Sequence, residues 1–127
     1  MHEAGMSDAS RLALILAFYL SKFDAAALSA LSNGTFQEAF SDIGQRFGVN
    51  PKSVKNKRDD FDPVFGNPRA GWHQRPLGPS RLKALYLLNN LSFDALTGFV
   101  RDLLHDAAFR QSGEVLEVLG AFKRATE

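Results

Sequence analysis

The sequence contains no cysteine, which excludes disulfides and thiolate metal sites and fits a reducing compartment. It also shows no secretory signal, and its apolar run Leu12 to Leu20 is nine residues long, too short to span a bilayer. We therefore expect a cytoplasmic protein without membrane association. The run is better explained as a helix buried in the core.

Signs of catalytic chemistry are also lacking. The three histidines, His2, His73 and His105, follow no metal-ligand spacing, and no Gly-rich phosphate loop, serine elbow or nuclease-like motif is present. Asp59, Asp60 and Asp62 could suggest a cation site, but Asp59 lies four residues after Lys55, the spacing of a helical ion pair. We expect no enzyme, no cofactor and no bound metal.

No segment alternates apolar and polar residues with period two for long enough to predict a strand. Apolar residues instead recur at helical spacing, and 127 residues with 45% hydrophobic content suit one compact domain. The sequence predicts an all-α fold: one domain over 1–127 with about six helices. A short strand pair in the Pro/Gly-rich loop 62–79, as a wing, is the alternative.

Residues 35–61 are predicted to form the central unit, two short helices joined at a tight corner. Thr35 is an N-cap, and Glu38 completes a capping-box pattern. Gly48 ends the first helix as a C′ glycine, Asn50 caps the second helix, and Pro51 fits its first turn. The apolar residues expected to face the core are Phe36, Phe40, Ile43 and Phe47 in the first helix and Val54 and Phe61 in the second.

This unit has the spacing of a helix-turn-helix DNA-binding motif. Small Gly44 allows the helices to approach closely, and Gly48 turns the corner. The second helix would enter the major groove of double-stranded DNA with Lys52, Ser53, Lys55 and Asn56 near bases and phosphates, Asn56 being suited to adenine. Contacts to phosphates are expected from Lys57, Arg58, Arg69, Arg75 and Arg81. Against this, Lys57 stands where such motifs usually carry an apolar residue.

Charge is segregated along the chain. Residues 44–83 hold nine Lys/Arg and three Asp, a formal +6, whereas the remaining residues sum to −5. The basic block coincides with the proposed DNA-reading unit, which favours nucleic-acid binding. The alternative is a solvated face, which charge runs commonly form.

The loop 62–79 carries the single tryptophan, Trp72, beside His73 and between Arg69 and Arg75. One interpretation is an arm next to the second helix that supplies phosphate contacts and a stacking ring. The other is that Trp72, Phe65 and Leu77 pin the loop onto the core while the arginines are solvated. We favour the second for Trp72 and the first for the arginines.

The flanking segments are predicted to be helices with polar caps. The first helix begins after Ser7 or Asp8 and runs to about Phe23, and Asp24 caps the next. The C-terminal helices occupy residues 80–124. Expected ranges are Ala25–Leu31, Arg81 to about Leu91 after Ser80, Phe93 to about Ala108 after Ser92, and Glu114–Arg124. The last helix is amphipathic and could pair with a second copy.

The runs Asp42 to Pro63 and Asn67 to Leu77 resemble a small helical module fused to bacterial restriction-type endonucleases of the HNH kind. The resemblance covers about residues 10–90 and implies a nucleic-acid or bacterial-defence setting. The fused catalytic domain and its His-Asn-His pattern are missing here, so no catalytic residue carries over. The resemblance implies a stand-alone version, a truncated fragment or an accessory subunit of a larger endonuclease.

Two functions follow. The favoured one is a helix-turn-helix DNA-binding module of a restriction, defence or regulatory system. The alternative is a helical protein–protein interaction module that binds no DNA, in which the Trp72 loop or the last helix docks onto a larger protein.

Overall fold

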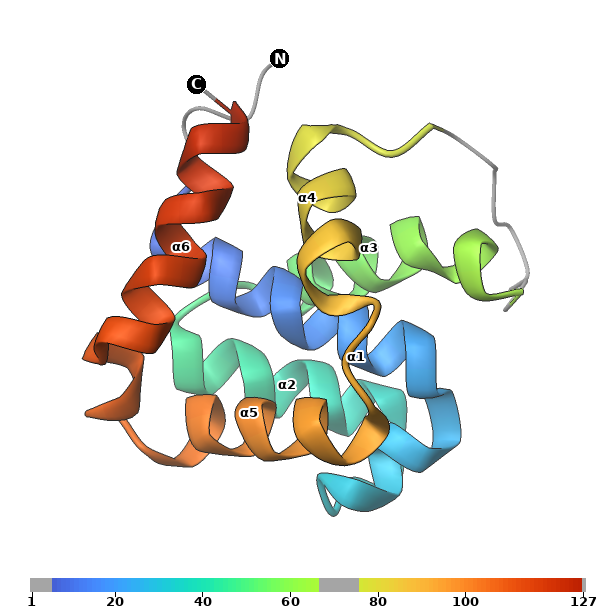
Figure 1. The fold of residues 1–127 in the computed structure, drawn as a ribbon. Helices are drawn as coiled ribbons and strands as arrows, with labels where there is room; N and C mark the ends of the chain where they lie inside the picture. The colour runs from blue at the N-terminus through green and yellow to red at the C-terminus, as the bar shows by residue number, and fades with distance from the viewer. Residues whose placement is uncertain (1–5, 67–75, 127) are drawn as a thin grey trace.

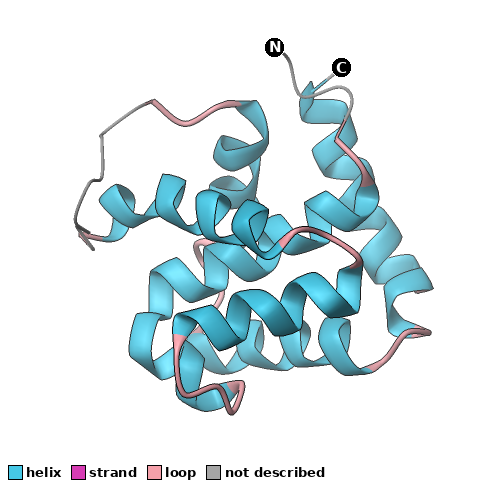
Figure 2. Ribbon diagram, turned by 180° about the vertical axis from the view of Figure 1, so that it is seen from behind, coloured by secondary structure: helices cyan, strands magenta, loops and turns pink. Residues whose placement is uncertain are grey.

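The computed structural model describes residues 6–66 and 76–126, with side chains as far as residue 124, and in these residues the protein is helical without strands (Figures 1 and 2). The helices are α1 (Asp8–Ala30), α2 (Phe36–Phe47), α3 (Pro51–Phe61), α4 (Pro79–Leu88), α5 (Phe93–His105) and α6 (Gly113–Thr126), with short 3-10 helices η2 (Asp62–Phe65) and η3 (Phe109–Gln111). The predicted all-α fold of about six helices is confirmed. The wing is not found in residues 62–66 or 76–79, and the rest of that loop lies outside the described residues.

Helix α1 is the centre of the fold and contacts all five other α-helices (Figure 1). Every residue from Leu12 to Leu20 is buried, because apolar side chains cover the whole circumference of this segment. By length and composition alone α1 could cross a membrane, yet 61% of its most apolar stretch is buried inside the protein. The predicted core helix is confirmed.

A kink at Asp24 divides α1. Asp24 has φ 49° and ψ −119°, outside the helical region, so the chain changes direction there as the sequence predicted. Ser7 is the N-cap, and its Oγ accepts a hydrogen bond from Ser10 N–H at 3.1 Å. The segment after the kink ends at Ala30, and Ser32 adopts a positive φ of 61° in the turn before α2.

Helices α1, α2 and α3 pack together into a three-helix unit. Phe40, Ile43 and Phe47 of α2 and Val54 and Phe61 of α3 are buried in the shared core. The ring of Phe61 meets that of Phe18 on α1 edge to face, with centroids 5.3 Å apart. The predicted apolar faces of the central unit are therefore confirmed, with Phe36 partly buried at the edge.

The boundaries of three helices, α4, α5 and α6, differ from the predicted ones. Helix α4 begins at Pro79 after Gly78, and Ser80, expected to be its cap, is a buried residue inside the helix. The same helix ends at Leu88 instead of Leu91. Helix α5 has the predicted cap, Ser92, but ends at His105 because Asp106 turns to an extended conformation. Helix α6 is longer than predicted and begins at Gly113.

Side-chain hydrogen bonds anchor α5 to the N-terminal half. The hydroxyls of Tyr19 and Thr97 lie 2.6 Å apart in the interior. At the C-terminus of α5, the carbonyl oxygen of Leu104 accepts from Arg46 Nη1 at 3.3 Å and from Arg110 Nη2 at 2.9 Å. These arginines satisfy a carbonyl that has no partner within the helix.

Candidate nucleic-acid interface

The corner between α2 and α3 depends on two glycines. Gly48 has φ 72°, the left-handed conformation that glycine adopts without steric cost. A Cβ on Gly44 would lie 2.6 Å from the carbonyl oxygen of Val49, so any side chain there would push the helices apart. The close approach predicted from the sequence is present.

Capping residues fix where both helices begin. Glu38 N–H donates to Thr35 Oγ1 at 3.1 Å, and Glu38 Oε1 accepts from Gly34 N–H at 2.8 Å. The capping box is thus shifted by one residue, since the carboxylate reaches the amide before the cap. Asn50 Oδ1 accepts from Lys52 N–H at 2.9 Å, which places Lys52 in the first turn of α3.

The outer side of α3 carries Lys52, Lys55 and Asn56, all exposed. Residues at i, i+3 and i+4 share one face of a helix, so the three form a single stripe. We call these residues the α3 stripe. The positive charge of the stripe is reduced at one end, because Lys55 Nζ lies 2.8 Å from Asp59 Oδ2 in an exposed ion pair. Ser53, on the flank, is half-buried.

Lys57 does not join this stripe. It is only 5% exposed, and its ammonium donates to Ser53 Oγ at 2.7 Å. Its aliphatic stem occupies the position where helix-turn-helix motifs usually bury an apolar side chain, as long lysine stems can. In this structure Lys57 is therefore not placed for the phosphate contact expected from the sequence.

Arg58 is also inside, with 4% of its surface exposed. Its guanidinium carbon lies 4.8 Å and 5.0 Å from the ring centroids of Phe36 and Phe40, and Nη2 donates to Asp59 Oδ1 at 2.8 Å. A planar guanidinium stacks well on aromatic rings. Arg58 therefore holds α2 against α3, and in this structure it is not placed for the phosphate contact expected from the sequence.

The other predicted contacts divide into two groups. Arg81 on α4 is half-buried, with Nε 3.3 Å from Asp60 Oδ2 on α3, so it joins these helices. Arg69, Trp72, His73 and Arg75 lie outside the described residues. The predictions for those four residues stay predictions.

The acidic residues of α3 are engaged by cations of the protein itself. Asp59 meets Lys55 and Arg58, and Asp60 meets Arg81. Asp62 follows α3 and accepts from Ser21 Oγ at 2.6 Å. Ion pairing at these aspartates is confirmed, and in the described part of the chain no group of three His, Asp or Glu is placed to hold a metal ion. The charge that α3 offers to a ligand comes from Lys52 and Lys55.

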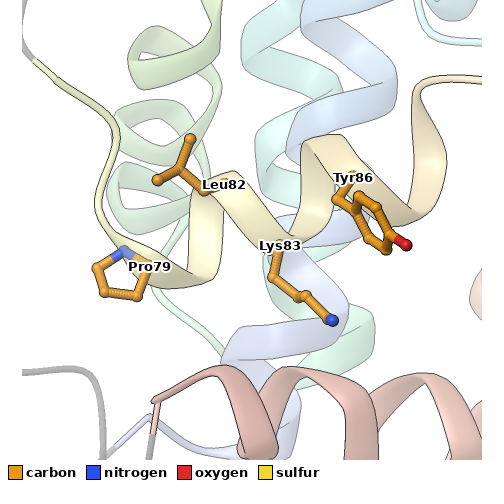
Figure 3. Close-up of a pocket in the computed structure, with 4 residues that line it drawn as sticks. All are labelled: Pro79, Leu82, Lys83 and Tyr86. Carbon is orange, nitrogen blue, oxygen red and sulfur yellow. The ribbon is translucent and has the colours of Figure 1, made fainter.

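A second exposed surface, on α4, was not recognised as one from the sequence. Leu82 and Tyr86 point outward and line a shallow depression with Pro79 and Lys83 (Figure 3). The signal was available, because Leu82 and Tyr86 are four residues apart and lie opposite buried Ala84 and Leu88.

No protein-family model, no curated protein and no solved structure matches this chain.

Proposed function

We propose that this chain is a helix-turn-helix DNA-binding module. The observation that carries the proposal is the α3 stripe, in which Lys52, Lys55 and Asn56 face solvent on the second helix of a glycine-cornered pair. A helix in this position can lie in the major groove while the preceding helix crosses the backbone. The three-helix unit behind it supplies a rigid support.

The residues of the stripe suit different roles. Asn56 can donate to and accept from the edge of adenine, because its amide holds both groups. Lys52 and Lys55 can neutralise phosphates or reach guanine. Since Lys57 and Arg58 are buried, the described part of α3 offers few phosphate contacts, and the proposal is for weak binding to duplex DNA with limited sequence selectivity.

The setting follows from the resemblance to the helical module of HNH-type endonucleases. We propose a role in bacterial restriction, defence or regulation, with the chain delivering a larger endonuclease subunit to DNA. The cytoplasm is the compartment in which such a protein would meet its DNA. This part of the proposal rests on the sequence resemblance.

A titration of fluorescent random duplex, followed by anisotropy at several salt concentrations, tests the proposal. Two lysine–phosphate contacts predict a slope of about −1.8 when the logarithm of the association constant is plotted against that of salt concentration. The double variant Lys52→Ala/Lys55→Ala should lose most of this slope and bind at least about tenfold more weakly at low salt.

The matched control is Lys123→Ala, which removes an exposed lysine of α6 whose Nζ lies 3.5 Å from Asp8. This variant should keep the affinity and the slope of the unchanged protein. Binding that is insensitive to salt, or equal losses in the control and the double variant, would contradict the proposal.

The alternative is a protein-interaction module without DNA binding. The exposed surface of α4 favours it, because Tyr86 is 77% exposed and Leu82 52% exposed on one side of a short helix. Purification from the native host followed by mass measurement distinguishes the two. A stable complex with another protein, free of nucleic acid, supports the alternative.

A further inference from the structure

Helix α4 presents an apolar surface without a partner in the described part of the chain. Pro79, Leu82, Lys83 and Tyr86 lie on its outer side (Figure 3), and we call them the α4 patch. The opposite side of the helix is buried through Ser80, Ala84 and Leu88. Single exposed apolar residues are normal on soluble proteins, whereas apolar residues that share one side of a helix are a candidate interaction surface.

The α4 patch has the chemistry of a protein-binding centre. Tyrosine supplies a large rigid surface at low entropic cost and is enriched among the residues that dominate binding energies. Here the ring of Tyr86 is held by Lys83, whose Nζ lies 5.1 Å from the ring centroid. The contact favours this orientation of the Tyr86 ring.

Among the described residues, charges of both signs that form no ion pair lie on α4 and on the neighbouring helix α6. Within residues 6–66 and 76–124, Lys83 forms no ion pair, although its side chain points toward α6 (Figure 3). Helix α6 packs against α4 and exposes Glu114 and Glu117, which form no ion pair in the same residues. The aspartates of α3, in contrast, are all engaged by arginine or lysine.

A surface with an apolar centre, an unmatched cation and unmatched anions on neighbouring helices is complementary to itself. A two-fold axis brings the same surface of two copies together, so each cation can meet the other copy's anion. The net charge of only +1 adds little repulsion between copies.

We infer that the α4 patch binds a second copy of this chain, with α4 of each protomer against α6 of the other. Leu82 and Tyr86 form the dry centre of the contact, and Lys83 pairs with Glu117 of the partner subunit. This inference does not depend on the proposed DNA binding. If that binding fails, the dimer remains testable, and the converse also holds.

Sedimentation equilibrium over a wide concentration range tests the inference. We expect a dimer that dissociates on dilution, and at least about a tenfold rise in the dissociation constant for Lys83→Glu and for Glu117→Lys, because like charges would then face each other. The double variant Lys83→Glu/Glu117→Lys should recover most of the lost affinity. Tyr86→Ser should also weaken the dimer, since a side chain this exposed can be shortened without disturbing the core.

Lys52→Glu is the control, because it changes the net charge as Lys83→Glu does but lies on the α3 stripe. It should leave the dimer unchanged, and circular dichroism should show that every variant is folded. A monomer at all soluble concentrations, or a double variant that is no better than the single ones, would overturn the inference. So would a weakening by Lys52→Glu equal to that by Lys83→Glu.

Discussion

Arg58 Nε lies 3.5 Å from Asp62 Oδ2, and both side chains are buried. The pair joins α3 to the start of η2, and Ser21 on α1 donates to the second carboxylate oxygen. Because Arg58 also stacks on two phenylalanines of α2, this ion pair ties the three helices of the central unit to one another. The charges of Arg58 and Asp62 stabilise the corner, and because they are buried they are not exposed to a ligand.

Asp62→Asn should therefore destabilise the protein. Losing one partner of a buried ion pair costs about 3–5 kcal/mol, and Arg58 keeps Asp59 as a second carboxylate, so we expect the lower end of that range. Urea denaturation followed by circular dichroism measures the change. Asp94→Asn, at an exposed position in the first turn of α5, is the comparison and should lie within about 0.5 kcal/mol of the unchanged protein.

Lys57→Met should leave both stability and DNA affinity nearly unchanged. Methionine fills a similar volume, and the substitution removes the desolvation cost of the buried ammonium together with its hydrogen bond to Ser53, so the two effects oppose each other. The same urea and anisotropy measurements apply. A large loss of duplex affinity in this variant would show that Lys57 leaves its buried position to meet phosphates.

The two glycines of the corner should differ in their response to alanine. In Gly48→Ala the new Cβ meets no atom within 4 Å, so the only loss of stability comes from the positive φ and amounts to about 1 kcal/mol. Gly44→Ala should cost more, toward the upper part of about 1–3 kcal/mol, because its Cβ meets the backbone oxygen of Val49. Thermal unfolding of both variants gives the order, and the reverse order would contradict the packing described at Gly44.

Burial raises the pKa of Tyr19 above its ordinary value of 10.0, although the hydrogen bond to Thr97 and the charge of Arg101 oppose the change. The folded protein thus favours the neutral phenol. Its contribution to stability is complete below pH 10 and is lost as the pH rises through the folded-state pKa.

We expect the unfolding free energy of the unchanged protein to fall in alkaline solution, and Tyr19→Phe to remove this part of the fall. The variant should also cost about 1 kcal/mol at neutral pH through the lost hydrogen bond to Thr97. Tyr86→Phe, at the exposed tyrosine, is the control and should retain the alkaline loss. Identical pH profiles for Tyr19→Phe and the unchanged protein would refute the assignment.

Asp59→Asn should raise the affinity for duplex DNA if the proposed function holds. The change removes a negative charge beside the α3 stripe and releases Lys55. Exposed ion pairs contribute about 0.2–1 kcal/mol, so we expect an increase of up to about fivefold. Anisotropy titration measures it, with Asp94→Asn as a control for the change in net charge.

Local chemistry made much of the fold predictable. The caps at Thr35, Asn50 and Ser92 and the left-handed Gly48 depend on residues close in sequence, and each is found where it was expected. The kink at Asp24 was predictable for the same reason, because a capping aspartate acts on residues next to it in the sequence. The end of α5 was missed because no glycine or proline marks it, and the start of α4 because Gly78 replaces a polar cap.

The candidate site was predictable only in part. The spacing located the exposed Lys52 and Lys55, since their side of α3 follows from the buried Val54 and Phe61. The burial of Arg58 depends on neighbours far away in the sequence, such as Phe36, and helical spacing alone does not reveal such neighbours. The outward direction of Tyr86 likewise depends on how α4 sits against α1 and α6.

The ion pair between Asp8 and Lys123 places the beginning of α1 beside the last turns of α6. A short flexible linker could therefore connect these helices, and the chain could be reopened in the exposed turn around Gly34. Such a circular permutant would keep the three-helix unit while moving both free ends next to α2. A fusion partner could then be attached beside α6 in the unchanged chain or beside α2 in the permutant.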